Sequence, residues 1–195
     1  RPGWFYHQHE DDKVRPLEEL INIYNSTVGG NSTFLLNIPP TPDGVFHEND
    51  VKRLMEMGDY LRRNFSAGLL DKAAIFCRAS LDGYCADNVR TDDYDTYFRT
   101  ADGITEATIE ISWDTPVEIG NIVLKENIRL SQRIESFVVT AYLDGVARDI
   151  YHGTVVGYKR IIPSVNVKAD KLTIRITDSR VAPTLSFIGV YRIIS

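Results

Sequence analysis

Ten residues near the start of the chain, Asn31-Ser-Thr-Phe-Leu-Leu-Asn-Ile-Pro-Pro40, constrain its fold more than any other stretch. From Thr33 to Ile38 the residues are almost all apolar and do not alternate with polar ones, which is typical of a strand covered on both faces. The Gly29-Gly30 pair ends the preceding element, and Pro39-Pro40 ends the strand because proline lacks the backbone donor that a ladder needs. The sequence therefore predicts a buried strand over 33–38.

Helical patterns flank this stretch on both sides. Pro16 suits the first turn of one helix, and the second helix is predicted from about Glu48 to Asn64. Arg1–Tyr6 is interpreted as the end of an earlier strand, so the order is strand, helix, strand, helix, the unit of an α/β barrel or doubly wound sheet. Two such units cannot close a barrel. The predicted inward residues are Leu17, Leu20, Ile21, Tyr24 and Val28 in the first helix and Val51, Leu54, Met55, Gly58, Leu61 and Phe65 in the second.

The pattern changes after Phe65 to short runs of β-branched and aromatic residues between turn signals, which predict a β-sandwich. Asp144-Gly145 is typical of a hairpin turn. We place the boundary near 66–71, which gives an α/β part over 1–66 and an all-β part over 67–195. The predicted strands are Ala107–Trp113, Ile119–Lys125, Ser136–Leu143, Thr154–Val156, Leu172–Thr177 and Leu185–Tyr191.

Composition narrows the classes of function. The net charge of −5 argues against a nucleic-acid partner, because phosphate binding needs a basic face. No apolar run approaches the ~18 residues of a membrane span, and the first residues do not have the pattern of a signal peptide. The two cysteines, Cys77 and Cys85, are compatible with a short disulfide loop or with two reduced thiols.

Several motifs follow one another along nearly the whole chain: Arg1-Pro-Gly-Trp-Phe-Tyr-His7, Leu20-x-x-Ile-Tyr-Asn-Ser-x-Val-Gly-Gly-Asn31, Leu35-Leu-Asn-Ile-Pro-Pro40, Asp43-Gly44, Asp50-Val-x-Arg-Leu54, Gln132-Arg-Ile-Glu-Ser-Phe137, Gly157-Tyr-Lys-Arg160 and Phe187-Ile-Gly-Val-Tyr191. In this order they resemble the α-L-fucosidases of glycoside hydrolase family 29. The later motifs resemble the discoidin-like β-sandwich of the branch that favours α-1,3/4-linked fucose.

This resemblance implies a C-terminal portion of such an enzyme: the last two βα units of a (β/α)8 barrel over 1–66, then a galactose-binding or discoidin-like jelly roll over 67–195. It implies a retaining glycosidase with an aspartate nucleophile and a glutamate acid/base, both upstream, so this chain holds no catalytic residue and is expected to be inactive alone. It implies a fucosylated glycan as substrate, the N-terminal part of the same enzyme as partner, no cofactor, and an extracellular, periplasmic or lysosomal location.

The resemblance also selects candidate substrate-binding residues. Trp4 falls at the C-terminal end of a presumed barrel strand, where barrel enzymes place their sites, and its ring is suited to the apolar side of fucose; the alternative is a core tryptophan. Tyr6 and His7 follow on the same rim as weaker candidates. For Asn37, the favoured interpretation is a hydrogen bond to local backbone rather than to a ligand.

Metal sites are weaker hypotheses. His7-x-His9 is followed by carboxylates, but a loop this polar is usually solvated and a structural zinc needs four fixed ligands. Asp93 and Asp95, in Asp92-Asp-Tyr-Asp-Thr-Tyr97, resemble the acidic loop that holds calcium in discoidin-like modules. Those modules usually place a glutamate where this chain has Phe187. The favoured interpretation is therefore no metal, with the aspartates forming turns.

The most charged set of the sandwich is open to two interpretations. It forms either a sugar-binding patch together with Tyr158, or an ion-paired network that joins loops or faces the barrel, which we favour. The set comprises Glu126, Arg129, Arg133, Glu135, Lys159, Arg160 and Arg180.

Two hypotheses of different class remain: the C-terminal part of a retaining α-L-fucosidase, or a stand-alone carbohydrate-binding or interaction module without catalysis. They differ in what residues 1–65 do. In the fucosidase, these residues should expose apolar faces made for barrel neighbours that are not in this chain. In the stand-alone module, they should form a compact unit.

Overall fold

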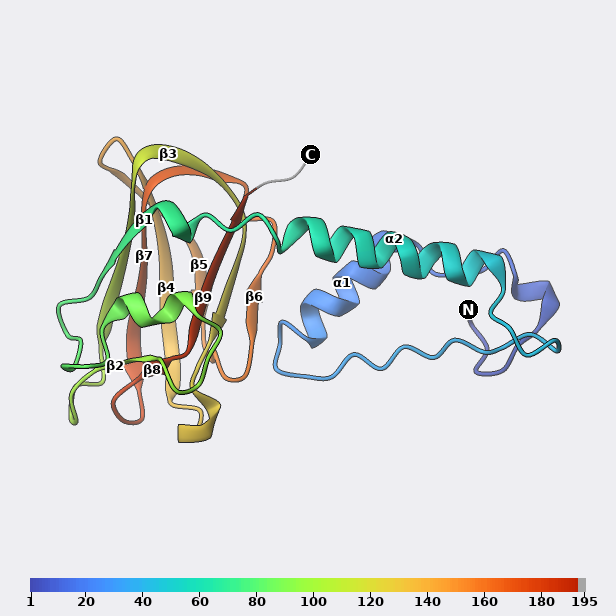
Figure 1. The fold of residues 1–195 in the computed structure, drawn as a ribbon, viewed down its shortest axis with the longest axis horizontal. Helices are drawn as coiled ribbons and strands as arrows, with labels where there is room; N and C mark the ends of the chain where they lie inside the picture. Colours follow the sequence, from blue (N-terminus) through green and yellow to red (C-terminus); the bar gives the residue numbers. More distant parts are fainter. Residues whose placement is uncertain (193–195) are drawn as a thin grey trace.

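A computed structural model describes residues 1–192 of the chain. An arm built from residues 1–66 projects from one side of a β-sandwich, which gives the molecule its elongated shape (Figure 1). The two α-helices lie in the arm, and the strands lie in the sandwich. The protein is mostly β-sheet with few helices.

The arm contains α1 (Leu17–Thr27) and α2 (Glu48–Asn64), as predicted. Pro16 sits at the N-cap of α1, and the chain turns at Gly29-Gly30 after the helix. At the start of α2 the imidazole Nδ1 of His47 accepts a hydrogen bond from the backbone N–H of Asn49 (3.2 Å). Four short 3-10 turns complete the helical elements: η1 (Gln8–Glu10), η2 (Leu70–Lys72), η3 (Ala86–Arg90) and η4 (Ile128–Leu130).

The predicted inward face of α2 is only partly right. Met57 is buried in a small cluster with Leu20 and Ile21 of α1. Val51 and Met55, predicted to face inward, are 43% and 58% exposed. The face of α2 that carries Met57 therefore packs against α1. The Val51 side meets no packed element among the described residues.

The predicted strand over 33–38 is wrong as a hydrogen-bonded element. Residues 33–40 form no ladder and run as a loop along the arm (Figure 1). Phe34 and Leu36 pack against the helices, whereas Leu35 is 82% exposed. Arg1–Tyr6 is likewise not a strand. A strand exists only with neighbours that take up its backbone hydrogen bonds, and the described part of the arm offers none.

The sandwich is one antiparallel sheet that folds over on itself, in the order β1-β3-β7-β4-β5, with β6 and β9 paired to the later part of β3. A short pair, β2–β8, lies beside it. The bounds are β1 (Ala73–Phe76), β2 (Phe98–Arg99), β3 (Ala107–Lys125), β4 (Ile134–Leu143), β5 (Val146–Gly153), β6 (Arg160–Ile162), β7 (Val167–Ser179), β8 (Thr184–Leu185) and β9 (Phe187–Arg192).

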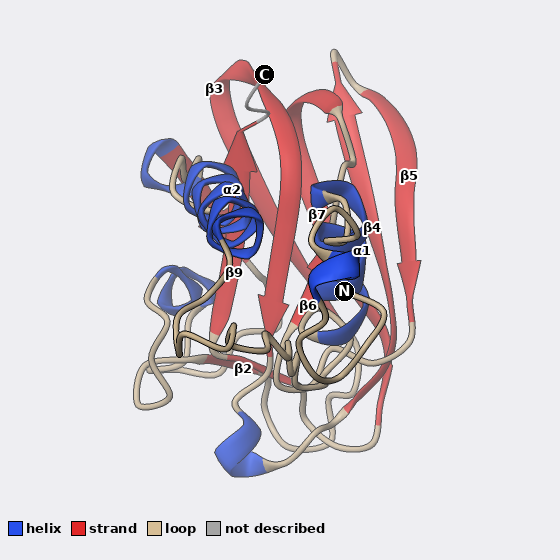
Figure 2. Ribbon diagram, turned by 90° about the vertical axis from the view of Figure 1, so that its right-hand side faces the viewer, coloured by secondary structure: helices blue, strands red, loops and turns tan. Residues whose placement is uncertain are grey.

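β3 joins the two layers. Its first half pairs with β1 and β7, its second half pairs with β6 and β9, and the strand bends over the top of the sandwich between them (Figure 2). The sequence predicted two strands here, over 107–113 and 119–125, where the structure has one. The pairing register with β7 shifts between Ser112 and Val117, so an irregularity accommodates Pro116 and the strand continues. The predicted strand over 154–156 is not formed.

The core lies between the layers and is filled by aliphatic side chains together with Phe98, Trp113 and Phe137. The hairpin between β4 and β5 turns at Asp144 and Gly145, as predicted, with φ values of 51° and 80° that suit a type I′ turn. Fully buried side chains include Ile109, Ile111, Ile122, Leu124, Val139, Leu172, Ile174, Ile176 and Val190.

The end of α1 docks on β6. The backbone N–H of Ile161 donates to the carbonyl of Gly29 (3.2 Å), and the N–H of Lys159 donates to Oδ1 of Asn31 (2.9 Å). A Cβ placed on Gly29 would lie 2.6 Å from the side chain of Ile161, so only glycine allows this approach.

A second contact follows α2. The ring of Phe65 packs edge-on against Tyr191 of β9, with centroids 5.5 Å apart. The N–H of Leu69 donates to the carbonyl of Val190 (2.8 Å), and the indole N–H of Trp113 donates to the carbonyl of Leu69 (2.8 Å). The arm is therefore attached to the sandwich at two places, one just after α1 and one just after α2.

Candidate functional site

A buried arginine organises the first loop of the arm. The guanidinium of Arg1, with a side chain only 2% exposed, forms ion pairs of 2.7 Å with Asp11 and with Asp50 of α2. These contacts raise the pKa of Arg1, and the hydrogen bond from Arg1 lowers the pKa of the Asp11 carboxyl. Sequence analysis missed this network, because the partners lie 10 and 49 residues from Arg1.

Trp4 lies on the wall of a cavity of about 570 Å³ between the first loop, the 33–38 segment and the two helices. Its side chain is 65% exposed, so it is not a core tryptophan within the described chain. The amide of Asn37 donates to the carbonyl of Trp4 (2.8 Å). Asn37 therefore serves local backbone, as favoured from the sequence, and ties the 33–38 segment to the tryptophan.

Tyr6 and His7, the other two predicted site residues, do not line this cavity. The hydroxyl of Tyr6 donates to Oδ2 of Asp11 (3.2 Å), and the Arg1 guanidinium lies 5.1 Å from its ring centre. The exposed ring of His7 faces His9, with centroids 5.5 Å apart. Of the three candidates, only Trp4 lines the cavity.

The acidic loop of the sandwich is held by hydrogen bonds and ion pairs. Oδ1 of Asp93 accepts from the N–H of Asp95 (2.9 Å), which is a local turn contact, and Asp95 pairs with Arg129 (2.8 Å). Across residues 1–192, no three or more His, Cys, Asp or Glu side chains gather as a metal site would require. Cys77 and Cys85 are free thiols, and burial raises the pKa of the Cys77 thiol.

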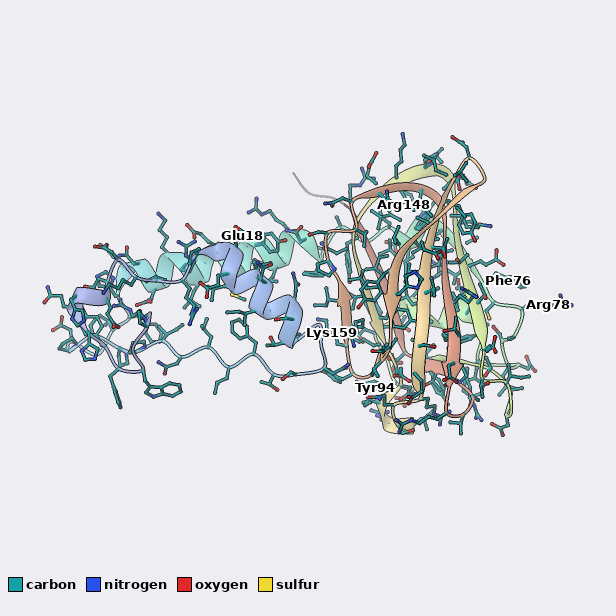
Figure 3. All side chains as sticks on the ribbon, turned by 180° about the vertical axis from the view of Figure 1, so that it is seen from behind. Glu18, Phe76, Arg78, Tyr94, Arg148 and Lys159 are labelled. Carbon is teal, nitrogen blue, oxygen red and sulfur yellow. The ribbon has the colours of Figure 1, made fainter. Side chains whose placement is uncertain are left out.

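Three residues of the predicted charged set of the sandwich form ion pairs: Arg180 pairs with Glu135, and Arg129 pairs with Asp95. Glu126 is instead buried among backbone N–H groups, without an ion pair in the described residues. The prediction of an ion-paired network is therefore correct only for Arg129, Glu135 and Arg180. Lys159 differs, because it forms no salt bridge within the described residues and lies at the junction with the arm (Figure 3).

A second cavity of about 640 Å³ lies at this junction, between the ends of the helices and the layer of β6 and β9. Lys125 and Lys159 contribute to its lining together with Tyr24, Phe187 and Tyr191. Sequence analysis named Lys159 but not the cavity, because its residues are up to 167 positions apart (Tyr24 to Tyr191). No helix within residues 1–192 has the length and apolar character needed to cross a membrane.

Comparison with known proteins agrees with this architecture. A family model described as alpha-L-fucosidase matches residues 2–66. The chain is 31% identical to alpha-L-fucosidase 1 of Arabidopsis thaliana over 98% of its own length and 39% of that protein. It therefore spans about two fifths of the length of the curated relatives it matches.

Solved structures resemble both parts of the chain together. A protein from Bacteroides thetaiotaomicron described as a putative alpha-L-fucosidase superposes with a TM-score of 0.94 at 30% identity, covering 98% of this chain and 43% of that one. A GH29 fucosidase from Ruminococcus gnavus, solved in complex with fucose, gives a TM-score of 0.89 at 27% identity and covers 100% and 40%.

In fold and in sequence, the chain is similar to part of several glycoside hydrolases. Within that class it is homologous to the C-terminal part of the α-L-fucosidases of family 29.

Proposed function

We propose that this chain is the C-terminal portion of a retaining α-L-fucosidase that removes α-linked L-fucose from glycans. In this proposal, the segments around Trp4 and over 33–38 are the last two strands of a (β/α)8 barrel, and α1 and α2 are its last helices. Residues 67–195 form the discoidin-like domain that follows. The homology to family 29 enzymes supports the proposal.

The observation that most directly supports this proposal is the exposed apolar surface of the arm. Leu35, Val51 and Met55 are exposed, although other apolar side chains of the same segments, such as Leu36 and Met57, are packed. Exposed apolar patches of this kind mark surfaces that bind another protein part. Barrel strands and helices earlier in the enzyme would cover them and would supply the missing hydrogen bonds to the 33–38 segment.

The chemistry then belongs to residues upstream. A retaining glycosidase needs two carboxyl groups about 5–5.5 Å apart, one to attack the anomeric carbon and one to protonate the leaving oxygen. The carboxylates nearest Trp4 are already engaged: Asp11 and Asp50 by Arg1, and Glu10 by the N–H of Gly3 (3.2 Å). None has the free geometry of a nucleophile, so we expect the chain alone to be inactive.

Trp4 is proposed to hold the apolar side of fucose in that complete enzyme, with Tyr6 and His7 beside it on the rim. Stacking a sugar on an accessible indole face buries enough apolar area for about 2 kcal/mol. We therefore expect Trp4→Ala to lower kcat/KM of the complete enzyme about 30-fold on an α-L-fucoside. The matched control is Phe5→Ala, because Phe5 is also largely exposed, at 75% against 65% for Trp4, but lies outside the cavity lining. Equal losses in both variants would contradict the role of Trp4.

The overall proposal is tested by intact mass and hydrolysis of a chromogenic α-L-fucoside on the natively purified protein. We expect turnover from a species that includes an N-terminal partner segment, and none from the 22.1 kDa chain alone. Turnover by the chain alone would overturn the assignment of the catalytic carboxylates. A stable, monomeric chain that binds sugar without a partner would favour the alternative, a stand-alone carbohydrate-binding module.

A further inference from the structure

The junction cavity between α1, α2 and the β6–β9 layer concentrates positive charge in a protein that is acidic overall. Its lining includes four basic side chains and a single carboxylate, Asp92, whereas the chain as a whole carries a net charge of −5. The basic residues are Arg62, Arg63, Lys125 and Lys159. Local charge opposite to the net charge attracts an anion to that place.

The two lysines of the junction cavity differ in their ion pairing. Lys125 pairs with Asp92, while Lys159 has no carboxylate within salt-bridge distance among residues 1–192 and is half-buried. Desolvation, followed by repulsion from Lys125, lowers the pKa of Lys159. An unpaired, partly desolvated ammonium costs free energy in the unliganded protein. A bound anion between the two lysines would remove that cost.

Aromatic rings adjoin the same ammonium groups. Nζ of Lys159 lies 5.9 Å from the ring centre of Tyr24, and Nζ of Lys125 lies 5.6 Å from that of Phe187. Tyr191 completes this side of the lining. Partly exposed aromatic faces beside hydrogen-bond donors are suited to the C–H face and hydroxyl groups of a sugar ring. The volume of about 640 Å³ accommodates a mono- or disaccharide.

We propose that the junction cavity binds a saccharide that carries an anionic substituent, a carboxylate or a sulfate, held by Lys125 and Lys159 against the aromatic wall. Trp4 does not line this cavity, so the binding site is separate from the one proposed for fucose. The proposal does not depend on hydrolysis. Because Tyr24 comes from the arm and Tyr191 from the sandwich, a ligand here would also bridge the two parts of the chain.

The test is calorimetric titration of the complete protein with matched ligands. Methyl glucuronide and glucose 6-sulfate are compared with methyl glucoside, which lacks the charge, and with inorganic sulfate, which lacks the ring. We expect one or both acidic sugars to bind at least tenfold more tightly than methyl glucoside and than sulfate. The stronger of the two identifies the anionic group. Equal affinities for the charged and neutral sugars, or for sulfate and the acidic sugars, would overturn the proposal.

Substitutions locate the site. Lys159→Gln is expected to weaken binding of the acidic sugar at least tenfold, and Lys159→Arg, which keeps the charge, to retain most of it. The control Lys168→Gln removes an exposed lysine of β7 outside the cavity and should change nothing. Lys159→Gln should not lower the melting temperature, since it removes a desolvated charge. Unchanged binding by Lys159→Gln would contradict the assignment, whatever the affinity of the wild type.

Discussion

Glu126 shows how one residue can fix three loops of the sandwich. Its buried carboxylate accepts hydrogen bonds from the backbone N–H groups of Arg133 (2.7 Å), Ile134 (3.0 Å) and Gly157 (2.6 Å). The donors belong to the start of β4 and to the loop before β6. A residue with two acceptor oxygens at this point satisfies backbone groups that would otherwise be buried without partners.

We predict that Glu126→Gln lowers the free energy of unfolding by about 1–3 kcal/mol, because the amide nitrogen would face a backbone donor and leave it unsatisfied. Glu135→Gln is the control, since Glu135 pairs with the exposed Arg180 and should change stability by less than about 1 kcal/mol. Urea unfolding measures both. A loss for Glu135→Gln as large as that for Glu126→Gln would argue against the role of the buried carboxylate.

The contact between Arg1 and Asp11 predicts an acid sensitivity of the first loop. The hydrogen bond lowers the pKa of Asp11 below its ordinary value of about 3.9. A depressed pKa stabilises the folded state above the unfolded pKa, and this stabilisation is lost as the pH falls through the folded value. We expect the melting temperature of the protein to fall below about pH 4, and to fall less steeply in Asp11→Asn. Identical slopes in the two proteins would rule out this ion pair as the cause.

At the scale of elements, α1 approaches the sandwich through a glycine that no other residue can replace without movement. A Cβ on Gly29 would lie 2.3 Å from the carbonyl oxygen of Asn25 and 2.6 Å from Ile161. We predict that Gly29→Ala destabilises the protein by about 1–3 kcal/mol through overpacking. Gly68→Ala is the matched control, because a Cβ there meets nothing within 4 Å. Thermal unfolding distinguishes the two, and equal melting temperatures would contradict the close contact.

The elements that the sequence predicted correctly are those set by local patterns. α2 begins and ends as predicted because its caps and its helical spacing lie within the segment itself. The strand over 33–38 has the composition of a buried strand, yet a strand also requires neighbours. For the same reason the apolar spacing of Val51 and Met55 predicted inward-facing side chains that are exposed within the described residues.

The candidate sites were less predictable than the elements. Trp4 was named from the sequence through the family resemblance, and Lys159 as a member of the most charged set of the sandwich. The cavities around them were not, since each is assembled from segments that only the fold brings together. The pairing of Arg1 with Asp50 is another example, because the polar residue lies on the packed face of an otherwise amphipathic helix.

At the scale of the whole molecule, the exposed apolar side of α2 distinguishes a free chain from part of a larger barrel. In the chain alone, Val51→Lys with Met55→Lys replaces exposed apolar groups, so the free energy of unfolding should change by less than about 0.5 kcal/mol. Solubility should rise, because the apolar patch is interrupted.

In the complete enzyme the same pair of substitutions should instead be strongly destabilising. If barrel neighbours cover the Val51 side of α2, two buried ammonium groups without partners cost more than about 2 kcal/mol each, and fucosidase activity and melting temperature should both fall. Lys52→Glu, on an exposed position of the same helix, is expected to be neutral in both forms. Chemical denaturation of the two proteins side by side gives the comparison. An enzyme that tolerates the double substitution as well as the free chain does would show that α2 keeps this face in solvent, and the barrel assignment of the arm would then be wrong.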